Sequence, residues 1–264
     1  MYKIGWFSSG RGAGSRELLA TMQESIERGE VRARIAFVFC NRERGFSEET
    51  DRFLDLVDSY HIPLICFSSF EFRRRLDAQQ LPDWRILYDR EVMKRLEDFE
   101  VELVVLAGYM LVAGPEMCQR YTLLNLHPAE PKGPKGTWRE VIRELIEDRA
   151  ERTGVMMHLA TPELDEGPPV TYCTFSIRGE PFEEHWRKLD EEPLEKIKER
   201  EAEESELFKL IRRHGLKREF PLIVATVKAF SEGKVKVRNG KITDAQGKPI
   251  EGYDLSAEIA RIVE

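Results

Sequence analysis

Short, almost continuously apolar runs recur along the chain, and they constrain its fold more than any other feature of the sequence. Apolar runs of about four to eight residues are typical of strands that are buried on both faces of a parallel sheet. We expect strands of this kind at residues 3–9, 34–40, 62–67 and 101–108. Segments with the apolar spacing of helices lie between them. Strands that alternate with helices predict an α/β fold with a Rossmann-like, mostly parallel sheet, helices on both faces, and ligands at the carboxyl ends of the strands.

The second half of the chain adds further elements and no clear boundary. Asn239-Gly240 stands in the middle of a period-two apolar pattern, which predicts a β-hairpin, and a short helix is expected from Ser256. The other expected elements are strands near 154–160 and 170–177, a charged helix over 191–213 and an apolar helix over 221–230. Because no repeat or low-complexity linker interrupts this order, we expect a single domain over residues 1–264 with a C-terminal hairpin and helix extension.

Composition excludes several classes of function. The formal net charge is −7 and the pI is near 5.5, whereas a nucleic-acid binder normally carries a basic excess. No apolar run approaches the ~20 residues of a membrane span, and the amino terminus lacks the order of a signal peptide. The four cysteines are scattered without a C-x-x-C pair, which favours reduced core residues of a cytoplasmic protein. We therefore expect no nucleic acid and no membrane among its partners.

Asn125 and His127 form the first candidate for chemistry. One residue separates them at the end of a short apolar segment, so on an extended chain their side chains share a face, and Pro128 then turns the chain away. An amide and an imidazole side by side are groups that an enzyme can use. A histidine satisfied by local hydrogen bonds at a strand end is the alternative.

A glycine-rich turn after the first expected strand is the second candidate. Residues 10–15 read Gly-Arg-Gly-Ala-Gly-Ser and precede a helix. Backbone N–H groups at such a helix start can hold a phosphate, and arginines can add charge-assisted bonds. The spacing matches neither a Walker loop nor a dinucleotide fingerprint, and a purely structural turn is equally compatible with it. The candidate phosphate-binding residues are Arg11, Gly12, Ala13, Gly14, Ser15 and Arg16.

Two later loops carry charged residues. Asp165 lies in a loop over 161–169, where its position before Gly167 and two prolines is also typical of an ordinary turn residue. The loop directly after Pro128 contains Lys132 and Lys135, which can reach an anion or remain solvated.

Together, the ordered motifs resemble the folate-dependent formyltransferase family. The matching pieces are Ser9–Ser15, Val104–Met110, Leu124–Pro128, Glu163–Pro168, Phe220–Val224 and Ala229–Val235. Within the family, the chain is most similar to the branch that formylates glycinamide ribonucleotide in purine biosynthesis and one-carbon metabolism. The resemblance implies that Asn125, His127 and Asp165 are catalytic.

The resemblance also implies the cosubstrate. It is 10-formyltetrahydrofolate, with no metal, and the folate contacts fall on Met110, Leu111, Val112, Glu163 and Leu164. Residues 1–100 would then bind the phosphate, residues 101–237 would carry catalysis and the folate, and residues 238–264 would be a tail. The resemblance leaves room for a homodimer. Asn125 and His127 would stabilise an oxyanion, and Asp165 would assist proton transfer.

Departures from the family pattern leave the acceptor open. Arg16 stands where asparagine is common, Leu111 where arginine is usual, and Leu216 and Lys217 where a Glu-His pair is usual. The loop over 129–136 also differs. The alternatives are therefore a transferase for another amine such as an amino sugar, a 10-formyltetrahydrofolate hydrolase, and a folate- or nucleotide-binding protein without turnover.

Overall fold

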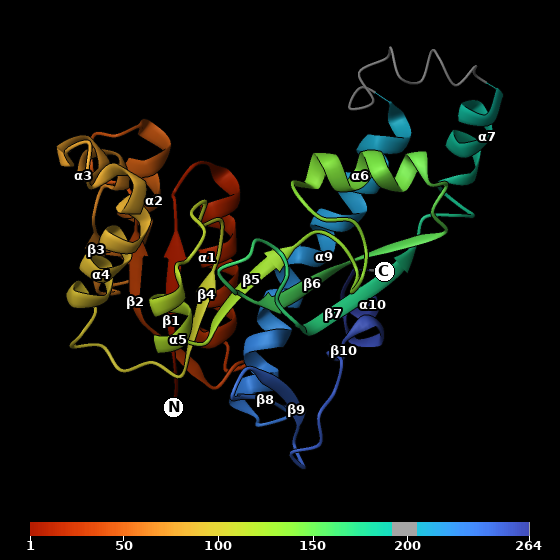
Figure 1. Cartoon of the computed structure of the whole chain (residues 1–264). Helices are drawn as coiled ribbons and strands as arrows, with labels where there is room; N and C mark the ends of the chain where they lie inside the picture. The colour runs from red at the N-terminus through yellow and green to blue at the C-terminus, as the bar shows by residue number, and fades with distance from the viewer. Residues whose placement is uncertain (192–204, 264) are drawn as a thin grey trace.

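The computed structural model describes residues 1–191 and 205–263. Its central feature is an eight-stranded sheet with the order β10-β7-β6-β5-β4-β1-β2-β3 (Figure 1). The strands are β1 (Tyr2–Ser8), β2 (Ala33–Cys40), β3 (Leu64–Cys66), β4 (Leu103–Leu106), β5 (Leu123–His127), β6 (Arg152–Leu159), β7 (Pro169–Ser176) and β10 (Tyr253–Asp254). Only the β5–β6 and β6–β7 pairs in this sheet are antiparallel. The predicted α/β fold with a mostly parallel sheet is confirmed.

Helices cover both faces of the sheet. They are α1 (Ala13–Glu27), α2 (Glu48–Ser59), α3 (Ser69–Arg75), α4 (Trp84–Arg95), α5 (Pro115–Arg120), α6 (Trp138–Glu147), α7 (Glu183–Glu191), α9 (Glu206–Ser231) and α10 (Ser256–Val263), with a 3₁₀ turn at Leu81–Asp83. Consecutive residues of β1 point to opposite faces. Trp6 packs in the core shared with α1, α2, α9 and α10, and Phe7 packs in the core shared with α4 and α5. Burial on both faces is the reason that this strand reads as a continuous apolar run.

The C-terminal extension has the predicted hairpin and helix. β8 (Val235–Arg238) and β9 (Lys241–Asp244) pair around Asn239-Gly240 in a separate two-stranded sheet, which lies below the main sheet in Figure 1. No sequence pattern predicted β10, a two-residue edge strand parallel to β7. Its residues are too few for a periodicity to show.

Helix α9 differs from its prediction. The expected charged helix over 191–213 lies partly outside the described residues, and from Glu206 onward one helix runs through Pro221 to Ser231. Proline normally interrupts a helix because it lacks an N–H and crowds the preceding turn. Here buried residues on both sides of the proline, including Ile211 and Leu222, pack into two cores and hold the helix together.

The glycine-rich turn is shorter than expected. Helix α1 begins at Ala13, so Ala13, Gly14 and Ser15 form its first turn instead of a loop. Gly12 is the extended residue before it, and no side chain caps this helix start. The first N–H groups of α1 therefore have no side-chain partner at the carboxyl edge of the sheet.

Candidate active site

Asn125 and His127 lie at the carboxyl end of β5, near the middle of the sheet. Asn125 is half-buried and His127 is buried. The Nε2 atom of His127 lies 2.8 Å from the carbonyl oxygen of Pro134. A carbonyl only accepts, so Nε2 must carry the hydrogen, and protonation of the neutral ring would add the second hydrogen at Nδ1.

A second buried histidine completes this site. His158 on β6 pairs with Asn125 in the antiparallel register, and its Nε2 lies 3.1 Å from Nδ2 of Asn125. Its Nδ1 lies 3.2 Å from the carbonyl oxygen of Leu159, so Nδ1 is the donor and Nε2 accepts from the amide. Burial lowers the pKa of His158, although the Asp165 carboxylate opposes this shift. His158 is therefore neutral near pH 7 and fixes the orientation of the Asn125 amide.

Sequence reasoning did not nominate His158. It stands inside an apolar strand, where a histidine is usually a satisfied core residue, and no local spacing connects it to Asn125. The only sequence signal was that His158 is the one histidine in the strand expected after the segment that carries Asn125 and His127.

Asp165 lies between the two imidazoles. Its Oδ2 lies 3.7 Å from Nδ1 of His127 and its Oδ1 lies 3.6 Å from Nε2 of His158. Both distances are slightly beyond hydrogen-bond length, and the contact with His127 becomes an ion pair only when that ring is protonated. The structure thus brings together the three residues that the resemblance had paired.

The loop that carries Asp165 is held by a close backbone approach. A Cβ atom at Gly167 would lie 1.6 Å from the carbonyl oxygen of Leu159, so only glycine fits against the end of β6. Asp165 itself has a φ of 54°, a left-handed conformation that aspartate tolerates better than most residues. This turn directs the carboxylate back toward the histidines.

The loop over 129–136 folds over the carboxyl end of β5. Besides the contact of Pro134 with His127, Lys135 pairs with Glu166 at 2.5 Å and Lys132 pairs with Glu251 at 3.2 Å. Both lysines were candidates for an anion contact. In this structure each has a carboxylate partner, and Lys135 ties the loop to the residue next to Asp165.

The glycine-rich turn and the loop after β4 are joined through Ser9. The Ser9 N–H donates to the carbonyl of Gly108, and its hydroxyl accepts from the N–H of Met110. The candidate phosphate and folate segments therefore sit side by side. Arg11 is exposed, whereas Arg16 is half-buried and its Nη1 lies 2.6 Å from Glu49.

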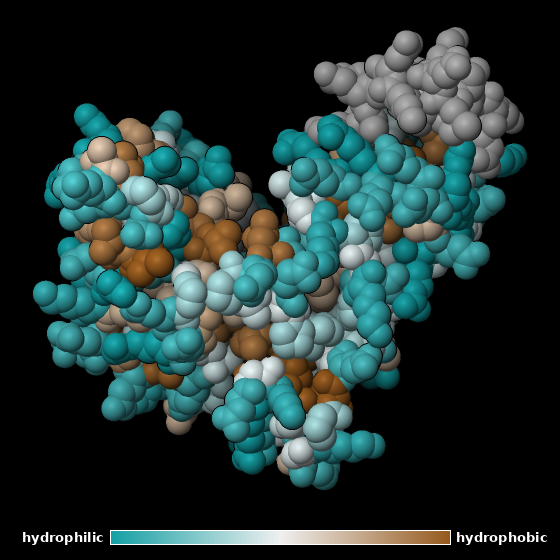
Figure 2. Space-filling view, viewed as in Figure 1, coloured by the Kyte–Doolittle hydropathy of each residue, from teal (hydrophilic) through white to brown (hydrophobic). Residues whose placement is uncertain are grey.

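The candidate folate residues lie on two loops, one after β4 and one that also carries Asp165. Met110, Val112 and Leu164 are large apolar side chains left exposed; Glu163 is exposed, and Leu111 is partly buried. Figure 2 shows a hollow between the part of the molecule around β1–β4 and the part around α6, with apolar residues along it. Exposed apolar side chains on loops at the carboxyl ends of the strands are suited to a flat, partly apolar ligand.

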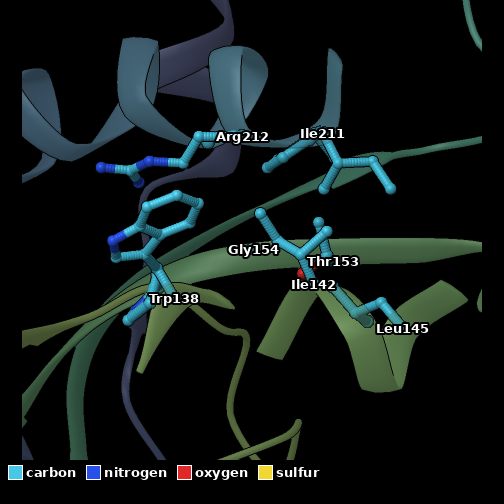
Figure 3. A pocket seen from close by; sticks show the side chains of 10 residues that line it. Trp138, Ile142, Leu145, Thr153, Gly154, Ile211 and Arg212 are labelled. Carbon is cyan, nitrogen blue, oxygen red and sulfur yellow. The ribbon is translucent and has the colours of Figure 1, made fainter. Parts of the chain in front are cut away.

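A smaller crevice lies behind the strand end, between α6, β6 and α9 (Figure 3). Trp138 and Ile142 of α6 face Ile211 and Arg212 of α9 across it. The Arg212 guanidinium lies 4.7 Å from the Trp138 ring centroid. None of the four polar side chains described above lines this crevice, so we assign it to the packing of α6 against α9.

Known proteins are similar to this chain over most of its length. Residues 3–188 match the formyl transferase family. The chain belongs to this family. The phosphoribosylglycinamide formyltransferase of Escherichia coli (strain K12) is 25% identical over 93% of this chain and 95% of its own length. The predicted family is thereby confirmed.

Solved structures show the same fold. The phosphoribosylglycinamide formyltransferase of Coxiella burnetii has a TM-score of 0.69 at 19% identity and covers 96% of this chain and 98% of its own. A formyltetrahydrofolate deformylase from Pseudomonas syringae has a TM-score of 0.62 at 18% identity and covers 92% of this chain and 65% of its own. At these identities the likeness concerns the fold alone. No helix among the described residues is long and apolar enough to cross a membrane.

Proposed function

We propose that this protein transfers the formyl group of 10-formyltetrahydrofolate to the amine of glycinamide ribonucleotide. The observation that supports this proposal most is the convergence of Asn125, His127 and Asp165 at the end of β5, within contact distances of 3.1 to 3.7 Å of one another or of His158. Membership of the family and relatives named as phosphoribosylglycinamide formyltransferases support the same substrates.

The proposed reaction begins with attack of the acceptor amine on the formyl carbon. A C–N bond forms, and negative charge develops on the former carbonyl oxygen. Asn125 keeps one amide N–H beyond the bond to His158, and the imidazolium form of His127 carries an N–H at Nδ1; both can donate to this oxygen. Loss of one preorganised donor of this kind costs about 3–4 kcal/mol of transition-state stabilisation.

Proton transfer completes the reaction. The attacking nitrogen becomes positively charged and loses a proton to Asp165, directly or through a water molecule. The bond between the formyl carbon and N10 of the folate then breaks, and N10 leaves with a proton that Asp165 can return. The products are the formylated amine and tetrahydrofolate, so no other reactant is required.

The proposal includes the binding segments. The α1 start would hold the acceptor's phosphate through its first N–H groups. Met110 and Val112 on one loop and Leu164 on the other would contact the folate.

An assay of 10-formyltetrahydrofolate consumption tests the proposal. The purified protein would be incubated with glycinamide ribonucleotide, with amino sugars, and without an acceptor. Consumption that depends on glycinamide ribonucleotide is the expected result. Consumption only with an amino sugar would contradict glycinamide ribonucleotide as the acceptor. Equal consumption without any acceptor would indicate a hydrolase.

A further inference from the structure

Five arginines surround the carboxyl ends of β1 and β2, and three of them are neutralised. Arg16 pairs with Glu49, Arg44 pairs with Asp55 and Asp58, and Arg52 pairs with Glu48 and Glu49. Within residues 1–191 and 205–263, the other two, Arg11 and Arg42, have no carboxylate partner. Glu43, the acidic residue beside Arg42, instead accepts a hydrogen bond from the Ser68 N–H.

The topology places these two arginines next to each other. Ser8 and Cys40 are partners in the parallel β1–β2 register, and Arg11 and Arg42 follow them by three and two residues. Burial, and after it the charge of Arg11, lower the pKa of Arg42. Two adjacent cations without a counter-charge stand beside the uncapped N–H groups of α1. An anion with two negative charges complements this arrangement.

Aromatic packing fixes the Arg42 side chain. Its guanidinium carbon lies 4.4 Å from the ring centroid of Phe46, and Phe46 in turn contacts Phe70 edge to face at 6.4 Å between centroids. A planar guanidinium held against a ring keeps its edge N–H groups available for a bidentate acceptor.

The strand order gives the distance that a ligand must span between the ends of β1 and β5. β1 lies two strands from β5, which is ~10 Å at the usual spacing between strands. One sugar ring between an amine at His127 and a phosphate at the α1 start covers about this distance. A phosphate beside Arg11 and Arg42 is therefore within reach of a sugar phosphate whose amine lies at the catalytic group.

We infer that Arg42, together with Arg11, holds the phosphate of the acceptor, and that Arg42 thereby selects a phosphorylated amine. This inference rests on the proposed function. It assigns to Arg42 the role for which the sequence had nominated Arg16, whose guanidinium is engaged by Glu49.

Steady-state kinetics with glycinamide ribonucleotide test the inference. In Arg42→Ala, the Michaelis constant (KM) for glycinamide ribonucleotide is expected to rise about 10- to 100-fold, the effect of losing a charge-assisted bond. The kcat and the KM for 10-formyltetrahydrofolate should change less than about threefold. Arg44→Ala is the matched control, because Arg44 lies in the same loop but has two carboxylate partners. Equal KM values in Arg42→Ala and Arg44→Ala would overturn the inference.

Calorimetric binding of ribose 5-phosphate separates this inference from the proposed function. The wild-type protein should bind ribose 5-phosphate, and Arg42→Ala should bind it at least about tenfold more weakly while Arg44→Ala binds it normally. This result supports the phosphate site even if glycinamide ribonucleotide is not formylated. No binding by the wild-type protein, or equal binding by both variants, overturns it. The affinity of Arg42→Lys for ribose 5-phosphate should lie between those of the wild-type protein and Arg42→Ala, because lysine keeps the charge and loses the planar fork.

Discussion

Asn125 and His158 face each other across the antiparallel β5–β6 pair, with the amide Nδ2 3.1 Å from the ring Nε2. The bond orients the amide, and the carbonyl of Leu159 fixes which ring nitrogen accepts. His158 therefore acts on Asn125 and not on the substrate in the proposed mechanism. Positioning residues of this kind hold a donor where charge develops.

Substitution of His158 tests the positioning role. His158→Ala leaves the Asn125 amide without its acceptor, and we expect kcat to fall about five- to tenfold, the effect of losing one neutral hydrogen bond of ~1 kcal/mol. His158→Gln offers a carbonyl oxygen to the same amide and should restore part of the rate. Steady-state assays of both variants check this. Equal losses in both would argue against orientation of Asn125 as the cause.

Stability should depend on pH through His158. Burial lowers its pKa in the folded protein, so the unfolded chain binds the proton more readily, and the free energy of unfolding rises with pH in this window. The contribution is complete above the unfolded pKa of about 6.5 and is lost as pH falls from there through the folded pKa. Urea unfolding at pH 7.5 and 5.5 measures the loss. His158→Gln, which does not titrate, should lose less stability over this range than the wild type.

The sequence was sufficient to predict those features that local patterns encode. Asn125 and His127 share one short strand, so spacing alone placed both side chains on one face. His158 and Asp165 reach the site only through the reversal at β6 and the turn closed by Gly167. Resemblance supplied Asp165. Because an antiparallel register leaves no mark in a single sequence, His158 could not be found that way.

Arg16 and Pro221 show a second limit of sequence reasoning. Arg16 stays a phosphate candidate, but no local pattern shows that its partner in the folded protein is Glu49 from the next helix, 33 residues away. The sequence predicted an apolar helix that begins at Pro221, but packing on both sides of the proline extends this helix back to Glu206. In both cases tertiary contacts decide the outcome.

Substitution of His127 should reduce the rate of formyl transfer without unfolding the protein. In His127→Ala the kcat for formyl transfer should fall about 10²–10³-fold, because one oxyanion donor is lost. Thermal unfolding should show an intact fold. Turnover within about tenfold of the wild type, in a protein that unfolds normally, would remove His127 from the mechanism.

The test of Asp165 requires a substitute residue that tolerates the left-handed backbone conformation at this position. Its φ of 54° is tolerated by asparagine, so Asp165→Asn removes the charge without adding strain. We expect kcat to fall about 10²–10⁴-fold, the range for a lost general base. Asp165→Ala should lose as much activity and some stability in addition. A rate in Asp165→Asn close to the wild type would exclude proton transfer through this carboxylate.

Asp89 should control the loop that carries Met110 and Val112. Its buried carboxylate accepts from the Gly114 N–H at 2.6 Å and from Nη2 of Arg85 at 2.9 Å, and the same Arg85 nitrogen also donates to the Val112 carbonyl. Burial raises the pKa of Asp89, and Arg85 opposes the shift. Asp89→Ala would leave the Gly114 N–H without its acceptor and the half-buried Arg85 without its carboxylate partner, which costs about 1–3 kcal/mol of unfolding free energy.

Loss of Asp89 should also weaken the binding of 10-formyltetrahydrofolate. With Gly114 and Val112 released, the loop over 108–114 loses its fixed shape, and we expect a higher KM for 10-formyltetrahydrofolate with a smaller change in the KM for the acceptor. Glu116→Ala is the control, since Glu116 forms an exposed pair with Arg90 at the start of α5, directly after the same loop. Urea unfolding and the two Michaelis constants would be measured for each variant. A destabilised Asp89→Ala protein with an unchanged KM for the folate would place the candidate folate contacts outside this loop.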